Sequence, residues 1–277
     1  MFYVIIGKEV LNMDKKIILF DVDGTLIDCQ NHHTHLTVAT KNSLRHLKAL
    51  GYYIFIASGR PYCFLLDELK EFDFDGYILD DGAYILFHDQ CLAYHPIAVH
   101  KITPIIQQVK QKNLTFVGYT QKKAYFYHDD GSLLNYCRTF VIDEQSIENI
   151  DDINSLQDQF LKIHVQAHSQ QDYQDILVNP NDFYSANDQQ HYLKEIYSTQ
   201  YTKATALHEV LEAVGIRQEN SYFFGDGLND IEMMQTVGHA IAMGNADPIV
   251  KKQADYICKS VDEDGVADFI EHSGLFF

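Results

Sequence analysis

Short apolar runs that end at polar residues recur in the first part of the chain. They cover residues 17–20, 52–57 and 76–79, and each is followed by a loop rich in Asp, Ser or Gly. Between the first two runs, leucines at helical spacing predict a helix over residues 40–50. Short runs that are apolar throughout are typical of parallel strands covered on both faces. Strands and helices that alternate in this way predict an α/β protein with a Rossmann-like, doubly wound parallel sheet.

The pattern changes at about residue 84. From there onward, shorter strand-like pieces separated by helical patterns predict an α+β insertion with an antiparallel sheet. The first type of alternation resumes with a helical pattern over residues 203–214. We therefore predict two domains: a core formed by residues 13–83 and 199–277, and an inserted α+β domain at residues 84–198.

The beginning of the chain does not fit either pattern. Met13 directly precedes the first strand and is a more natural start than Met1, so we expect residues 1–12 to be an extension from an upstream start codon. The apolar run at residues 2–6 is too short for the hydrophobic region of an export signal.

Composition restricts the class of protein and its partners. Of the 277 residues, 46% are hydrophobic and 22% are charged, which is ordinary for a soluble globular protein. The formal net charge of −18 disfavours binding to nucleic acid or to an anionic membrane surface. The same charge repels small phosphorylated molecules, so a phosphate site needs its own cation or metal. Five scattered cysteines without a Cys-x-x-Cys pair fit a reduced, cytoplasmic protein.

The first candidate for chemistry is the carboxylate pair Asp21 and Asp23 at the end of the first apolar run. Gly24 lets the chain turn after the pair, so the second carboxylate is oriented independently of the first. The two aspartates are therefore able to take different roles. Taken alone, the segment is also an ordinary turn sequence, and other segments must decide between these interpretations.

Further polar residues follow other predicted strands or begin a core helix. The carboxyl ends of parallel strands face one crevice, so we expect these side chains to converge with the carboxylate pair. Clustered carboxylates without a thiolate or histidine partner suit a hard cation, of which Mg²⁺ is the best match. The residues concerned are Ser58, Lys203, Asp226, Asn229 and Asp230.

With these motifs in order, the chain resembles the haloacid dehalogenase (HAD) superfamily, specifically the Cof-like phosphatases with a type IIB cap. The four motifs match residues 21–25, residues 57–60, Lys203 and residues 225–230. The long segment between the second and third motifs matches the place of the family's cap. The resemblance covers nearly the whole chain.

The resemblance implies roles for the acidic residues. Asp21 would attack phosphorus to form an aspartyl-phosphate, and Asp23 would act as general acid and base. Mg²⁺ would be held by the carboxylate of Asp21, the backbone carbonyl of Asp23 and the carboxylate of Asp226, with Asp230 supporting the water shell of the metal.

The resemblance also implies a phosphate-binding set. Ser58, with backbone N–H groups near Gly59, and Lys203 would bind the phosphoryl oxygens, with Asn229 in support. The chain departs from the family pattern at two positions. Ala204 stands where a glycine often follows the lysine, and Asp81 stands where an asparagine is usual.

We therefore predict a cytoplasmic, Mg²⁺-dependent phosphatase for small phosphorylated metabolites such as sugar phosphates, nucleotides or cofactor phosphates. A phosphomutase acting on hexose phosphates and a non-catalytic module that binds phosphorylated metabolites remain alternatives. Tyrosines of the insertion, such as Tyr119, Tyr125 and Tyr127, are compatible with packing or with lining a pocket. The sequence does not determine the physiological substrate or the oligomeric state.

Overall fold

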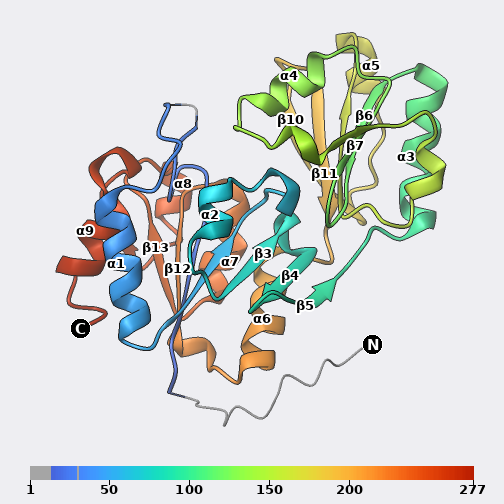
Figure 1. Cartoon of the computed structure of the whole chain (residues 1–277). Helices are drawn as coiled ribbons and strands as arrows, with labels where there is room; N and C mark the ends of the chain where they lie inside the picture. The colour runs from blue at the N-terminus through green and yellow to red at the C-terminus, as the bar shows by residue number, and fades with distance from the viewer. Residues whose placement is uncertain (1–13, 30) are drawn as a thin grey trace.

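The described part of the chain forms two β-sheets, of eight and six strands, in separate parts of the molecule (Figure 1). The computed structural model describes residues 14–29 and 31–277. The expected extension, residues 1–12, lies outside the described residues. The strands of the larger sheet are β1 (Ile17–Phe20), β2 (Tyr53–Ala57), β3 (Gly76–Leu79), β4 (Tyr84–Phe87), β5 (Gln90–Tyr94), β12 (Ser221–Gly225), β13 (His239–Ala242) and β14 (Tyr256–Ile257).

The larger sheet has the strand order β14-β13-β12-β1-β2-β3-β4-β5. The pairs from β14 to β3 are parallel, and β4 and β5 join as antiparallel strands at one edge. Alternate residues of β1 face opposite layers: Ile18 and Phe20 lie in one apolar cluster, and Ile17 and Leu19 in the other. The sheet is therefore covered on both faces, which confirms the predicted doubly wound α/β core.

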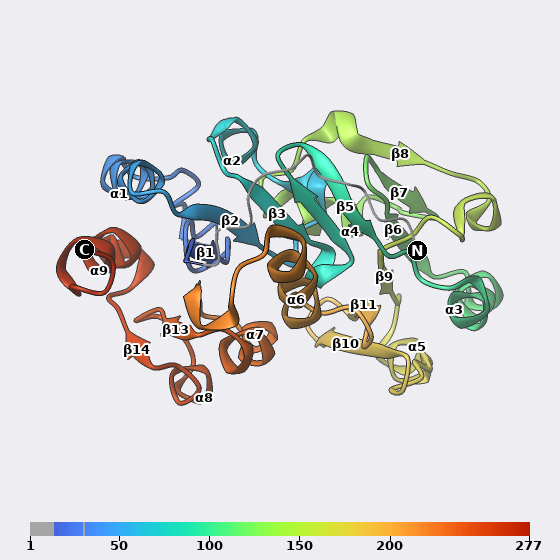
Figure 2. The ribbon, with the colours of Figure 1, turned by 90° about the horizontal axis from the view of Figure 1, so that it is seen from below.

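Helices from both parts of the core sequence cover the larger sheet. In Figure 2, α6 and α7 lie on the opposite side of the strands from α1. The helices are α1 (Val38–Ala49), α2 (Asp67–Glu71), α6 (Lys203–Val214), α7 (Ile231–Thr236), α8 (Pro248–Lys251) and α9 (Gly265–His272). Thr202 caps α6 by accepting the backbone N–H of Thr205, so the helix starts with Lys203 in a fixed place. Among the described residues, no helix combines the length and apolar character that a membrane span requires.

The smaller sheet has the strand order β10-β11-β9-β6-β7-β8 and is antiparallel except for β7 with β8. Its strands are β6 (Thr115–Tyr119), β7 (Ala124–Tyr127), β8 (Ile147–Asn149), β9 (Lys162–Gln166), β10 (Phe183–Asp188) and β11 (Leu193–Ser198). The helices of this part are α3 (Val99–Lys112), α4 (Ser132–Arg138) and α5 (Gln170–Asp175). The chain thus contains the antiparallel α+β insertion that the pattern predicts.

The structure corrects the sheet assignment at the start of the insertion. We expected residues 84–94 to belong to the smaller sheet, but β4 pairs with β3 and extends the larger one. The apolar side chains of β4 are buried by the core, whose Phe55 stacks on Phe87. We therefore propose that the inserted domain begins after β5.

Candidate active site

Asp21 lies at the carboxyl end of β1 and is tied to a buried lysine. Its backbone N–H donates to the carbonyl of Phe224 on β12 at 2.9 Å, which fixes the residue beside the neighbouring strand end. Lys203, the first residue of α6, donates from Nζ to Asp21 Oδ1 and to Asp230 Oδ1, both at 2.7 Å. The lysine side chain is only 1% exposed. One buried cation therefore links two of the predicted site carboxylates.

Three carboxylates lie close enough to share one cation. One oxygen each from Asp21, Asp226 and Asp230 falls within 4.8 Å of the others. Burial raises the pKa of Asp226 to about 7, and the Asp230 charge adds to this, while the hydrogen bond from Thr25 opposes it. Burial also raises the pKa of Asp21 despite the Lys203 charge. When all three carboxylates are ionised, their negative charge exceeds the single positive charge of Lys203, and an oxygen-seeking divalent cation fits the group.

Asp230 accepts more hydrogen bonds within this group than Asp21 or Asp226. Its Oδ1 accepts from Lys203, and its Oδ2 accepts the backbone N–H groups of Asp226 at 3.0 Å and Gly227 at 2.9 Å. The residue is fully buried. Its geometry suits orienting the loop after β12 and the lysine.

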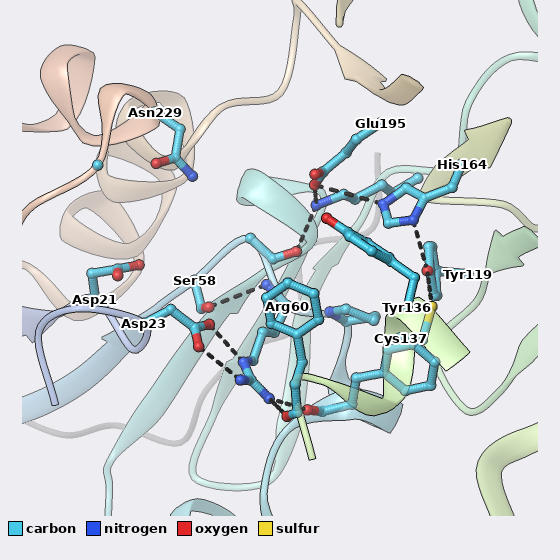
Figure 3. A pocket seen from close by; sticks show the side chains of 16 residues that line it. Asp21, Asp23, Ser58, Arg60, Tyr119, Tyr136, Cys137, His164, Glu195 and Asn229 are labelled. Atoms are coloured by element: carbon cyan, nitrogen blue, oxygen red, sulfur yellow. Dashed lines mark hydrogen bonds and ion pairs between the residues drawn. The ribbon is translucent and has the colours of Figure 1, made fainter. Parts of the chain in front are cut away.

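Asp23 points away from this group and toward Arg60. The guanidinium donates a hydrogen bond to each carboxylate oxygen, from Nε to Oδ2 and from Nη2 to Oδ1, both at 2.7 Å (Figure 3). Arg60 also donates to the carbonyls of Phe64 at 3.0 Å and Phe140 at 2.8 Å. Because Phe140 belongs to the insertion, Arg60 connects the carboxylate of Asp23 to that part of the chain.

The turn after Asp23 requires a glycine. Gly24 has a φ of +86°, and a Cβ at this position would lie 2.1 Å from Asp226 Oδ2. This close approach brings the loop after β1 against the loop after β12. It allows Asp21 and Asp23 to diverge as the sequence predicts, and it leaves no room for a side chain beside Asp226.

Three of the predicted phosphate-binding residues, Ser58, Gly59 and Asn229, line one cavity together with Asp21 and Asp23. Ser58 is buried at the end of β2, and its Oγ accepts the backbone N–H of Arg60 at 3.1 Å. The carbonyl of Gly59 accepts from Lys162 at 2.8 Å. Asn229 donates its amide to Asp81 at 3.1 Å. Ser58 and Asn229 are therefore held by neighbouring groups.

A cavity of about 210 Å³ lies between these loops and the insertion. Figure 3 shows Asp21, Asp23 and Ser58 on one side, with His164 and Glu195 of the smaller sheet on the other. Tyr119, one of the tyrosines with an open role, lines the cavity and bonds its hydroxyl to His164 Nδ1 at 3.1 Å. The remaining walls contributed by the insertion are Tyr136, Cys137, Phe140 and Lys162.

The sequence did not single out several residues of this cavity. Arg60 could have been identified from the sequence, because it directly follows Ser58 and Gly59 in the second motif. No sequence motif marks Lys162, His164 and Glu195, because they lie on the neighbouring strands β9 and β11 of an insertion whose orientation depends on tertiary packing.

A further buried carboxylate lies beneath the site. Asp80 is 1% exposed, and neither of its carboxylate oxygens has a hydrogen-bond partner within the described part of the chain. Burial raises the pKa of Asp80 to about 8, while the charge of Lys162 opposes the increase and that of Asp81 adds to it. The folded protein therefore favours the neutral carboxylic acid at this position.

We expect Asp80→Asn to stabilise the protein as pH rises. The pKa of Asp80 is higher in the folded than in the unfolded state, so its stabilising contribution is complete below pH 4 and is lost progressively toward pH 8. The variant lacks this loss. Between pH 5 and pH 7, its free energy of unfolding in urea should therefore increase by about 1–3 kcal/mol relative to that of wild type. Asp67→Asn, at a carboxylate that is 76% exposed, is the control. If the free energies of unfolding of variant and wild type differ by the same amount at pH 5 and at pH 7, Asp80 is not neutral in the folded protein.

Comparisons with known proteins agree with the resemblance to the HAD superfamily. A family model described as haloacid dehalogenase-like hydrolase matches residues 18–270. The Bacillus subtilis protein named "Putative phosphatase YkrA" is 29% identical over 95% of this chain and 99% of its own. The solved structure titled as the HAD subclass IIB sugar phosphatase BT4131 has a TM-score of 0.80 and 23% identity, covering 94% of this chain and 99% of that one. A Bacillus subtilis phosphatase, YwpJ, is 22% identical over 93% of this chain and 99% of its own.

Proposed function

The chain belongs to the haloacid dehalogenase-like hydrolases and is a phosphatase of that superfamily, and from this premise we propose that it hydrolyses small phosphomonoesters with Mg²⁺ through an aspartyl-phosphate. The observation that carries the proposal is the surroundings of Asp21. One of its carboxylate oxygens accepts from Lys203 at 2.7 Å, and Asp226 lies within ligand-sharing distance of it. A carboxylate held in this way is a suitable nucleophile for phosphorus.

In the proposed reaction, the carboxylate of Asp21 forms a bond to phosphorus as the ester oxygen leaves with its electron pair. Asp23 gives a proton to that oxygen and then takes one from the water that hydrolyses the aspartyl-phosphate. Arg60 donates one hydrogen bond to each oxygen of Asp23, which leaves each oxygen a further lone pair for a proton. Arg60 thereby keeps the carboxylate in one orientation.

The metal site in this proposal consists of the carboxylates of Asp21 and Asp226 and the main-chain carbonyl of Asp23, with Asp230 holding the loop that carries Asp226. A bound Mg²⁺ offsets the repulsion between the anionic nucleophile and the anionic phosphate. Ser58, the N–H groups near Gly59, Lys203 and Asn229 bind the phosphoryl oxygens.

The substrate's leaving group would occupy the cavity under the insertion. Its volume of about 210 Å³ suits a small metabolite. The similarity to a structure titled as a sugar phosphatase supports including sugar phosphates in the first substrate panel, together with nucleotides and cofactor phosphates. Phosphate release across this panel tests the proposal and ranks the substrates.

Removing the metal is expected to abolish turnover of para-nitrophenyl phosphate. Several kcal/mol of transition-state stabilisation would be lost with the cation, which corresponds to at least about 10²-fold in rate. Chelation followed by addition of Mg²⁺ should restore the rate, and Asp226→Asn should raise the Mg²⁺ concentration that gives half of the maximal rate. Circular dichroism checks that the chelated protein remains folded. Full activity in excess chelator would contradict the metal assignment.

A further inference from the structure

Asp81 is held in an unusual backbone conformation beside the phosphate-binding loops. It lies in the short 3₁₀ turn Asp80–Gly82 between β3 and β4, with a φ of 55°. Few residues adopt this left-handed region, although Asp and Asn tolerate it better than most. A Cβ on Gly59 would lie 2.9 Å from Asp81 Oδ1, so the carboxylate packs directly against the loop after β2.

Lys162 approaches the same place from the insertion. As the first residue of β9, it donates from Nζ to Asp81 Oδ2 at 2.9 Å and to the carbonyl of Gly59 at 2.8 Å, and it also contacts the carboxylate of Glu195. The side chains of Lys162 and Asp81 are each only 4% exposed. The three contacts match the three N–H donors of the ammonium group, and two of them connect the smaller sheet to loops of the core.

The second oxygen of Asp81 reaches a third loop. Oδ1 accepts from Asn229 Nδ2 at 3.1 Å, so two different donors converge on one carboxylate. An asparagine at position 81 offers a single acceptor atom. It would lose one of the two contacts or force the amide of Asn229 to turn over.

These contacts also change the balance of charge around the phosphate site. Asp81 and Glu195 add two carboxylates to those of Asp21, Asp226 and Asp230. Both contact Lys162, whose single positive charge offsets one of the two negative charges. Although burial opposes the charged forms, the two carboxylates hold the pKa of Lys162 above its usual range.

We propose that Asp81 and Lys162 are positioning residues for the phosphatase reaction: their buried pair holds the insertion against the Gly59 loop and fixes Asn229, and Lys162 offsets part of the negative charge that Asp81 and Glu195 bring to the phosphate site. This inference rests on the proposed function. Neither residue touches the reacting atoms, and both act through Gly59 and Asn229. The carboxylate at position 81, where the resembled family usually has an asparagine, is thus matched by a cation from the other domain.

The test compares Lys162→Met, Asp81→Asn and the double variant with wild type. The readouts are the dissociation constant for inorganic phosphate, measured by calorimetry, KM and kcat for para-nitrophenyl phosphate, and the melting temperature. Lys123→Met is the matched control, because it removes an exposed lysine–glutamate pair from the same sheet.

Lys162→Met should weaken phosphate binding by roughly 10-fold to 100-fold, because two carboxylates near the site lose their counter-ion. Asp81→Asn should weaken it by a smaller factor, about 3-fold to 10-fold, through the lost contact to Lys162 or Asn229. The double variant should bind phosphate at least about 3-fold more tightly than Lys162→Met alone, since Asp81→Asn removes one unpaired charge. Recovery in phosphate affinity is a result that a purely structural role would not produce.

Phosphate affinity within 2-fold of wild type in Lys162→Met, or losses that simply multiply in the double variant, would overturn the inference, even if the melting temperature falls. If Lys162→Met does not fold, Asp81→Asn alone decides: unchanged phosphate affinity and KM would reject the role of Asp81. Phosphate binding does not depend on turnover. A wild-type protein without Mg²⁺-dependent activity would therefore contradict the proposed function while leaving this comparison measurable.

Discussion

Asp21→Asn is expected to abolish phosphatase turnover, with a loss in kcat of at least about 10⁴-fold. The amide lacks the charged oxygen that would attack phosphorus, so no aspartyl-phosphate forms. The fold should survive, because the amide oxygen is still able to accept the hydrogen bond from Lys203. The substitution also removes one carboxylate from a crowded buried group. Burial raises the pKa of Asp21, so the variant should be at least as stable as wild type at neutral pH.

The measurement is Mg²⁺-dependent hydrolysis of para-nitrophenyl phosphate, together with urea unfolding of the same preparations. Acid-quenched wild-type protein should carry the mass of one phosphoryl group during turnover, and the variant should not. Asp67→Asn is the matched control, since it makes the same change at an exposed helix position. Retained Mg²⁺-dependent turnover in Asp21→Asn would exclude this residue as the nucleophile.

The core of the fold was predictable because it depends on local pattern. Short runs such as residues 17–20 and 222–224 are apolar or aromatic throughout, and the structure buries them in one sheet that is covered on both faces. The edge strands at residues 84–94 were assigned to the wrong sheet. An antiparallel hairpin at the edge of the core has the same pattern as one in the insertion, and only tertiary pairing distinguishes them.

Part of the candidate site was also predictable from the sequence, and part of it was not. Asp21 and Asp226 approach each other because the ends of parallel strands lie along one edge, a rule that needs no side-chain detail. Two other contacts depend on how loops and domains pack: the paired hydrogen bonds from Arg60 to Asp23, and the ion pair of Lys162 with Asp81. Lys162 and the carbonyl it binds at Gly59 are 103 positions apart in the chain. No spacing or motif encodes such a contact.

Lys203→Met is expected to reduce both stability and activity strongly. The Nζ atom lies 2.7 Å from carboxylate oxygens of both Asp21 and Asp230, and its side chain is 1% exposed. Methionine has a similar length but leaves two buried carboxylates without their cation, a change that costs about 3–5 kcal/mol. Lys259→Met is the control, because its pair with Asp268 is exposed to solvent and should contribute little to stability.

The pH dependence of Lys203→Met distinguishes loss of charge from loss of packing. Burial raises the pKa of Asp21 and Lys203 opposes that increase, so removing the lysine raises the pKa further. Asp21 must be ionised to attack phosphorus, and the acid limb of the rate profile should therefore move to higher pH. The additional loss of stability relative to wild type should therefore grow as pH rises from the wild-type pKa of Asp21 toward the higher pKa in the variant. A constant loss of stability with an unmoved acid limb would show that Lys203 contributes packing alone.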